Sequence, residues 1–116
     1  MEEDRKNHAK YLIFRYAEEL FTCVSDLLHP ELEELMNLPS HGLSKDELID
    51  VLFDLFSNHE LVAARENRGL FTPTLEEIVK ALDEPNDIKA KLSNTYYGIT
   101  SAAIEPLKMF EQKYGN

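Results

Sequence analysis

The sequence has few of the residues that build covalent or metal-based sites. Its 116 residues include one cysteine, Cys23, and no tryptophan. A single cysteine excludes an intramolecular disulfide, and a zinc site would need mostly non-cysteine ligands. The four glycines stand alone, so no glycine-rich loop is present to bind phosphate. We therefore expect neither a metal nor a cofactor.

Long hydrophobic runs are absent as well. No unbroken apolar run exceeds four residues, whereas a membrane-spanning helix needs about 20. The sequence thus predicts neither a membrane span nor the apolar core of a signal peptide. The chain is long enough to bury one core without disulfides, so we expect a single cytoplasmic domain over residues 1–116.

Positive charge is scarce. The chain has 12 Lys and Arg against 22 Asp and Glu, which gives a formal net charge of -10. Residues 1–66 carry a net charge of -9, and residues 67–116 carry only -1. A negative field of this size repels nucleic acid and anionic lipid and favours a basic partner. Any nucleic-acid interface would have to lie in the second half.

What the sequence does contain is mainly helical periodicity. Apolar residues recur every three or four positions over residues 8–28, which predicts a long first helix. Pro30 is expected to end it and to open a short helix that runs to Leu38. A last helix is expected around Leu107, Phe110 and Tyr114.

Two capping boxes mark further helix starts. Ser44 with Glu47, and Thr74 with Glu77, have the spacing of this motif. In it, the side chain of each residue accepts a hydrogen bond from the backbone amide of the other. They predict helices over residues 44–57 and 74–83. After the first of these, we expect the helical pattern, or a second short helix, to continue through Ala64.

The elements together predict an all-α domain of five to six helices. The helix over 44–57 is apolar around most of its circumference, so we expect it between the first helix and the 74–83 helix. Residues 70–72 and 95–99 are β-prone and could add a minimal two-stranded ribbon, as in a winged helix. The long first helix could also support a homodimer.

Residues 74–94, TLEEIVKALDEPNDIKAKLSN, resemble the helix-turn-helix of bacterial repressors. The agreement lies in the apolar positions Leu75, Ile78, Ala81, Leu82, Ile88 and Leu92. Asp83 and Glu84 depart from the motif, because its tight turn usually contains glycine. The resemblance implies a winged-helix DNA-binding regulator that uses residues 74–98. Its candidate contacts are Arg68, Lys80, Asn86, Lys89, Lys91 and Asn94.

A second pattern is acidic. Asp46, Asp50 and Asp54 follow at four-residue spacing, which places three carboxylates on one ridge of a helix. Each like-charged pair at this spacing costs roughly 0.2–0.5 kcal/mol. Negative charge is favoured at the helix start, but no Lys or Arg stands four residues from Asp50 or Asp54. A docking face for a basic partner and an ordinary solvated face both explain this ridge.

Signals for catalysis are absent. The four histidines, His8, His29, His41 and His59, include no pair at the spacing of helical metal ligands. No serine lies in a nucleophile elbow. The preferred hypothesis is a small acidic, cytoplasmic, non-enzymatic binding or regulatory protein that docks on a basic protein surface through Asp46, Asp50 and Asp54. The alternative is the DNA-binding regulator.

Overall fold

The computed structural model describes residues 2–19, 22–29, 37–85 and 93–115. They contain four α-helices: α1 (Glu3–Glu19), α3 (Lys45–Ser57), α4 (Leu75–Leu82) and α5 (Ile104–Tyr114). Four strands form one antiparallel sheet: β1 (Thr22–Cys23), β2 (Leu61–Arg65), β3 (Gly69–Phe71) and β4 (Tyr96–Ile99). The described residues also include two short 3₁₀ helices, η1 (Val24–Leu28) and η3 (Ser101–Ala103).

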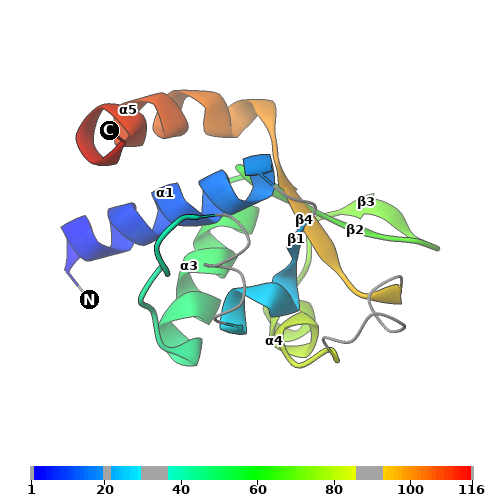
Figure 1. The fold of residues 1–116 in the computed structure, drawn as a ribbon. Coiled ribbons are helices and arrows are strands. Elements are labelled where there is room, and N and C mark those ends of the chain that lie inside the picture. Colours follow the sequence, from blue (N-terminus) through cyan, green and yellow to red (C-terminus); the bar gives the residue numbers. More distant parts are fainter. Residues whose placement is uncertain (1, 20–21, 30–36, 86–92, 116) are drawn as a thin grey trace.

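The prediction of an all-α domain of five to six helices is wrong, because the fold is mixed α/β. In Figure 1 the sheet lies at the right of the molecule, α1, α3 and α5 lie to its left, and α4 lies below it. The predicted ribbon of residues 70–72 and 95–99 is also wrong. These segments do form β3 and β4, but the strand order β1-β4-β2-β3 puts β2 between them.

The first helix is shorter than its periodicity predicts. It ends at Glu19 rather than at residue 28, and Cys23 lies in β1, buried, instead of in mid-helix. A local carboxylate and a distant carbonyl bind the backbone here. The Cys23 amide donates to Asp26 Oδ2 at 3.0 Å, and the Val24 amide donates to Thr95 O at 2.9 Å. The predicted short helix over 30–38 falls largely outside the described residues.

Both capping boxes are confirmed. The Ser44 hydroxyl accepts from the Glu47 amide, and the Glu47 carboxylate accepts from the Ser44 amide, so α3 begins as predicted. Thr74 and Glu77 form the same pair at the start of α4. A cap of this kind contributes roughly 0.5–2 kcal/mol.

Helix α3 ends at Ser57, which is also the last residue of the predicted helix over 44–57. His59 adopts a left-handed conformation with φ of 58°. Its amide donates to Phe56 O at 3.0 Å, and the Glu60 amide donates to Leu55 O at 2.9 Å. These two bonds make a Schellman motif, which ends the helix. Residues 61–65 then form β2, so the predicted helical continuation through Ala64 is wrong.

The core is centred on α3. Val51, Leu52 and Leu55 are fully buried, and α3 packs against both α1 and α4, as predicted. The helices cover the sheet face that carries Leu61, Ala63 and Tyr97. The Tyr97 hydroxyl donates to the Ile13 carbonyl of α1 at 2.8 Å, which ties this face to the helices.

The apolar face of α1 is used within the chain. Leu12, Ile13 and Phe14 are buried, and α5 packs along α1 with Phe110 stacked on Phe14. Figure 1 shows α5 running across α1 at the top of the molecule. A homodimer through α1 would therefore have to use its polar face. In the described part of the chain, no helix combines the length and the apolar character needed to cross a membrane.

Candidate functional site

The predicted acidic ridge lies on the outer surface of α3. Asp46 and Asp50 are exposed, and neither makes an ion pair within the described residues. Asp54 does have a cation partner, because Lys6 Nζ of α1 lies 2.8 Å from its Oδ2. The hydrogen bond to Asp54 is the largest influence that raises the pKa of Lys6, and the charges of Glu3 and Asp50 raise it further. The first turns of α1 therefore lie beside the ridge.

A second contact fixes the start of α1 against α3. Arg5 donates from Nη1 to Glu47 Oε2 at 2.7 Å and from Nη2 to Glu47 Oε1 at 3.0 Å. Its Nη2 also donates to the carbonyl of Gly42 at 2.9 Å. The hydrogen bonds from Arg5 and from the Ser44 amide lower the pKa of Glu47 to about 2. Arg5 and Lys6 thus neutralise two of the carboxylates that α3 presents.

The acids around these contacts form a surface that we call the acidic face. It consists of Glu2, which precedes α1, Glu3 in the first turn of α1, and Asp46, Asp50 and Asp54 of α3. Lys6 lies within this surface and pairs with Asp54. The acidic face is therefore negative even after this ion pair is counted, and on α3 its free carboxylates are Asp46 and Asp50.

An exposed aromatic residue lies within the acidic face. Phe53 is 41% exposed, although the sequence placed it on an apolar helix and therefore in the core. It follows Asp50 by three positions and Asp46 by seven, and both spacings put residues on the same side of a helix. This spacing was the signal that could have identified Phe53 from the sequence. The acidic face thus combines free carboxylates with an apolar ring.

A different hollow lies between the β2–β3 hairpin and α4. It has a volume of about 530 Å³, and Phe71, Pro73 and Ala81 contribute its apolar lining. Arg65 crosses one wall, where Nη1 donates to Glu84 Oε2 at 2.7 Å and to Thr95 Oγ1 at 2.6 Å. The Arg65 guanidinium therefore links Thr95, just before β4, to Glu84, just after α4.

The other cations of this cleft also face carboxylates. Arg68 pairs with Glu77 and lies 3.8 Å from the centre of the Phe71 ring. Lys80 pairs with Glu76 at 3.3 Å on the exposed surface of α4. Each of the described cations of the cleft is thus paired with a carboxylate.

These positions bear directly on the predicted DNA contacts. Arg68 and Lys80 are in ion pairs, and Asn94 is buried with its Nδ2 donating to Pro85 O at 2.6 Å. The first helix of the proposed helix-turn-helix exists as α4. Its second helix, together with Asn86, Lys89 and Lys91, lies outside the described residues. Of the described contacts, Arg68 and Lys80 both line the cleft between the β2–β3 hairpin and α4, whereas Asn94 is buried.

The histidines have no common site in the described part of the chain. His41 accepts a hydrogen bond at Nδ1 from the Leu43 amide and contacts Leu27 O through Nε2 at 2.7 Å. Burial lowers the pKa of His41, which favours its neutral form. Among the described residues, no group of three or more histidine, cysteine or acidic side chains could hold a metal ion.

Comparisons of this chain with known proteins found no match. No family model matches the chain, and neither a curated protein nor a solved structure matches it. The functional argument therefore depends on the surfaces described above.

Proposed function

We propose that this protein is a non-enzymatic, cytoplasmic binding protein that docks on a basic protein surface through its acidic face. The observation that carries the proposal is the position of Phe53 beside the free carboxylates of Asp46 and Asp50. Aromatic side chains are typical anchors of protein interfaces, and charges around them set the choice of partner. The partner presents lysine or arginine side chains around an apolar hollow that accepts the ring.

Two physical effects favour this mode of binding. Asp46 and Asp50 repel each other across one helical turn, and a cation on the partner would relieve that repulsion. The net charge of -10 also speeds encounter with a basic protein at low salt. Asp54 contributes less than the sequence suggested, because Lys6 already binds it.

Site-specific crosslinking tests the proposal. Phe53 is replaced by the photocrosslinking amino acid p-benzoylphenylalanine in cells of the natural host, and the adducts are identified by mass spectrometry. The same amino acid at Leu75, which is 48% exposed on α4, serves as the comparison position. We expect position 53 alone to crosslink a small set of basic proteins.

Matched charge variants then assign the contact to the acidic face. Asp46→Asn with Asp50→Asn should remove these adducts and slow association with the identified partner by about tenfold at low salt, with a smaller effect at high salt. The control, Glu66→Gln with Glu105→Gln, removes the same charge from exposed positions elsewhere. Adducts that are identical in both variants, or equal at positions 53 and 75, would contradict the proposal.

A further inference from the structure

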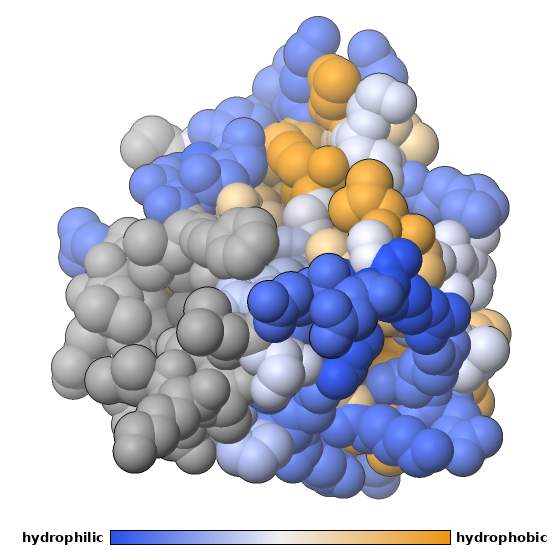
Figure 2. Space-filling view, turned by 90° about the vertical axis from the view of Figure 1, so that its right-hand side faces the viewer, coloured by the Kyte–Doolittle hydropathy of each residue, from blue (hydrophilic) through white to orange (hydrophobic). Residues whose placement is uncertain are grey.

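Helix α5 is the least buried of the four described α-helices. Its eleven residues are all described and none of them is buried, whereas α1, α3 and α4 each contribute several buried residues to the core. Leu107, Phe110 and Tyr114 reach the core only as half-buried side chains. In Figure 2, which looks from the side of the hairpin tip, the molecule narrows towards the top, where α5 lies. Helix α5 therefore forms a ridge with solvent on both sides.

The start of α5 has no side-chain cap. Its N-cap residue is Ala103, whose methyl group cannot accept a hydrogen bond from the free amides of the first turn. Ser44 and Thr74 supply such an acceptor to α3 and α4. The stability of α5 therefore depends on its packing against α1.

Helix α5 packs along α1 and against η3, which precedes it. Phe110 stacks on Phe14 with the ring centres 6.4 Å apart. At the C-terminal end of α5, the Tyr114 hydroxyl donates to Asp4 Oδ1 at 2.7 Å, and Lys113 Nζ lies 2.6 Å from the same oxygen. The side chains of Asp4 and Lys113 are 64% and 62% exposed, so their ion pair contributes little. Further contacts are the stack of His8 on Tyr114 and the hydrogen bond from Tyr11 to Glu111.

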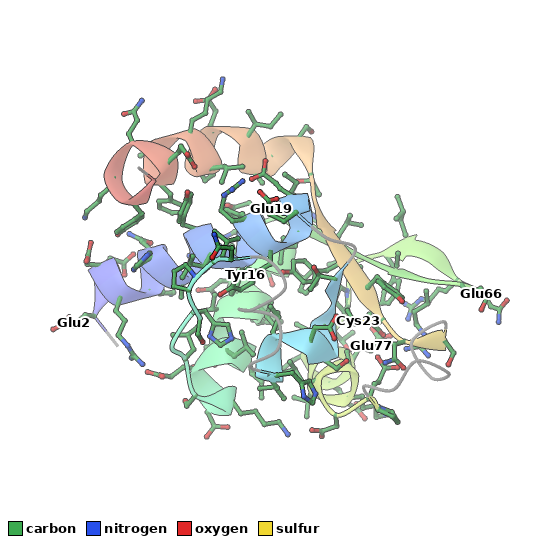
Figure 3. All side chains as sticks on the ribbon, in the orientation of Figure 1. Glu2, Tyr16, Glu19, Cys23, Glu66 and Glu77 are labelled. Carbon is green, nitrogen blue, oxygen red and sulfur yellow. The ribbon has the colours of Figure 1, made fainter. Side chains whose placement is uncertain are left out.

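The part of α1 beneath α5 carries aromatic side chains. Phe14 is 0% exposed and Tyr11 is 6% exposed, although the helix that covers them has no buried residue of its own. In Figure 3, Glu2 and Glu19 mark the two ends of α1, and α5 lies alongside α1 between them. The removal of α5 would therefore expose two aromatic rings.

The rest of the molecule holds α1 in place without α5. The Ile13 carbonyl accepts a hydrogen bond from Tyr97 of β4, and Arg5 binds Glu47 at the start of α3. Both contacts join α1 to the core elements, and neither includes a residue of α5. The loss of α5 thus leaves the position of α1 fixed.

The chain is anchored immediately before α5. The Thr100 amide donates to the carbonyl of Glu60 at 3.1 Å, and Ala103 of η3 is 0% exposed. The next residue, Ile104, is 46% exposed. This abrupt change from buried to exposed places a hinge between Ala103 and Ile104.

We infer that α5 is a hinged cover of α1. It opens away from α1 as one unit about the hinge, while α1, α3 and the sheet stay folded. Elements with few buried apolar contacts are those that open at the lowest free energy. The closed form hides Phe14 and Tyr11, and the open form presents them, so the position of α5 decides whether these rings meet solvent.

Hydrogen exchange of the whole chain, followed amide by amide by NMR, tests the inference. The amides of residues 108–114 lie within the hydrogen-bonded turns of α5. We expect them to exchange about tenfold or more faster than the amides of α3, and all with one common opening free energy. Protection equal to that of α3 would overturn the inference. So would protection that falls steadily towards residue 114, because that pattern describes fraying of the helix end.

A distant variant separates the opening of α5 from global unfolding. Thr74→Ala removes the cap of α4, which stays folded when α5 opens. It should speed the exchange of α3 by about tenfold, because it destabilises the whole fold, and leave the exchange of α5 unchanged. An equal acceleration in α5 would show that α5 opens only when the whole chain unfolds, and would overturn the inference.

A pair of variants within α5 tests the contact that holds the cover closed. Phe110→Ala removes the half-buried ring on Phe14 and should speed the exchange of α5 by about tenfold. The control Met109→Ala changes a side chain of the same helix that is 67% exposed, and its exchange should match that of wild type. Equal exchange in the two variants would contradict the inference.

Discussion

Glu47 accepts hydrogen bonds from two parts of the chain at once. Its carboxylate caps the Ser44 amide at the start of α3 and binds the Arg5 guanidinium of α1. Both groups stabilise the ionised form, so the pKa of Glu47 falls from 4.5 to about 2 on folding. The contact between α1 and α3 therefore depends on whether Glu47 is ionised.

This coupling predicts a pH dependence of stability. Between pH 2 and pH 4.5 the unfolded chain binds more protons at Glu47 than the folded chain does, so the stability contributed by Glu47 is complete above pH 4.5 and is lost as the pH falls towards 2. Chemical denaturation across this range should show a steeper loss for wild type than for Glu47→Gln. In an Arg5→Ala background the difference should shrink, because Arg5 is the main cause of the lowered pKa. An equal slope in all variants would contradict the assignment.

Individual residues also show where reasoning from the sequence stops. The spacing of Asp46, Asp50 and Asp54 correctly placed them along α3, because position along a helix is a local property. Spacing could not reveal that Lys6 binds Asp54, since the two residues are brought together only when α1 packs on α3. The exposure of Phe53 could not be predicted for a related reason. Hydrophobicity predicts burial, but only the neighbouring elements decide which side of α3 they cover.

At the scale of elements, the sequence predicted the bounds of α3 and α4 closely, but it did not predict the strand that follows α3. Ser44 and Thr74 carry recognisable caps within four residues, and α3 and α4 begin there. The end of α3 depends on His59 in a left-handed conformation, a position where glycine or asparagine is the usual signal. With no such signal, and with two helix-forming alanines in Leu61–Arg65, the periodicity could not separate β2 from a continued helix.

The strain at His59 predicts a stabilising substitution. A left-handed conformation is unfavourable for residues with a Cβ atom, so His59→Gly should raise the free energy of unfolding by up to about 1 kcal/mol, after the added flexibility of the unfolded chain is subtracted. Ser57→Gly, two residues earlier inside the helix, is the control and should destabilise by about 0.5 kcal/mol. Urea denaturation measures both changes. Destabilisation by His59→Gly would show that contacts of the imidazole outweigh the strain.

At the scale of the whole molecule, the largest error of prediction was that the sheet was missed. Each described strand has five or fewer residues. β2 and β3 form a local hairpin, but β4 pairs with β1 and β2, which lie far from it in the sequence. β1 pairs with β4 through Thr22 and Tyr97, so no local pattern could have identified either strand as part of a sheet. Tertiary pairing decided the conformation of these segments. The alignment of Asp46, Asp50 and Asp54 was predictable because it depends on α3 alone.

The electrostatic field of the whole chain predicts that it does not bind duplex DNA. The net charge is -10, and Arg65, Arg68 and Lys80 all face carboxylates. Phosphate neutralisation supplies most of the affinity of such binding, so fluorescence anisotropy with a labelled duplex should show none at physiological salt. Sub-micromolar binding that weakens steeply with salt, and that Lys89→Ala with Lys91→Ala abolishes, would overturn this expectation.

The central position of β4 has a consequence for biosynthesis. A ribosome makes β1 and β2 long before it makes Tyr96–Ile99, yet β4 lies between those two strands and pairs with both. Until residue 99 leaves the exit tunnel, the nascent chain has no template on which to close its sheet, and both strand edges stay available to other chains. Such late, long-range pairing makes folding slow and exposes the chain to aggregation. The sheet is therefore expected to close only after residue 99 has left the exit tunnel, and chaperones that shield unpaired strand edges matter most before that point.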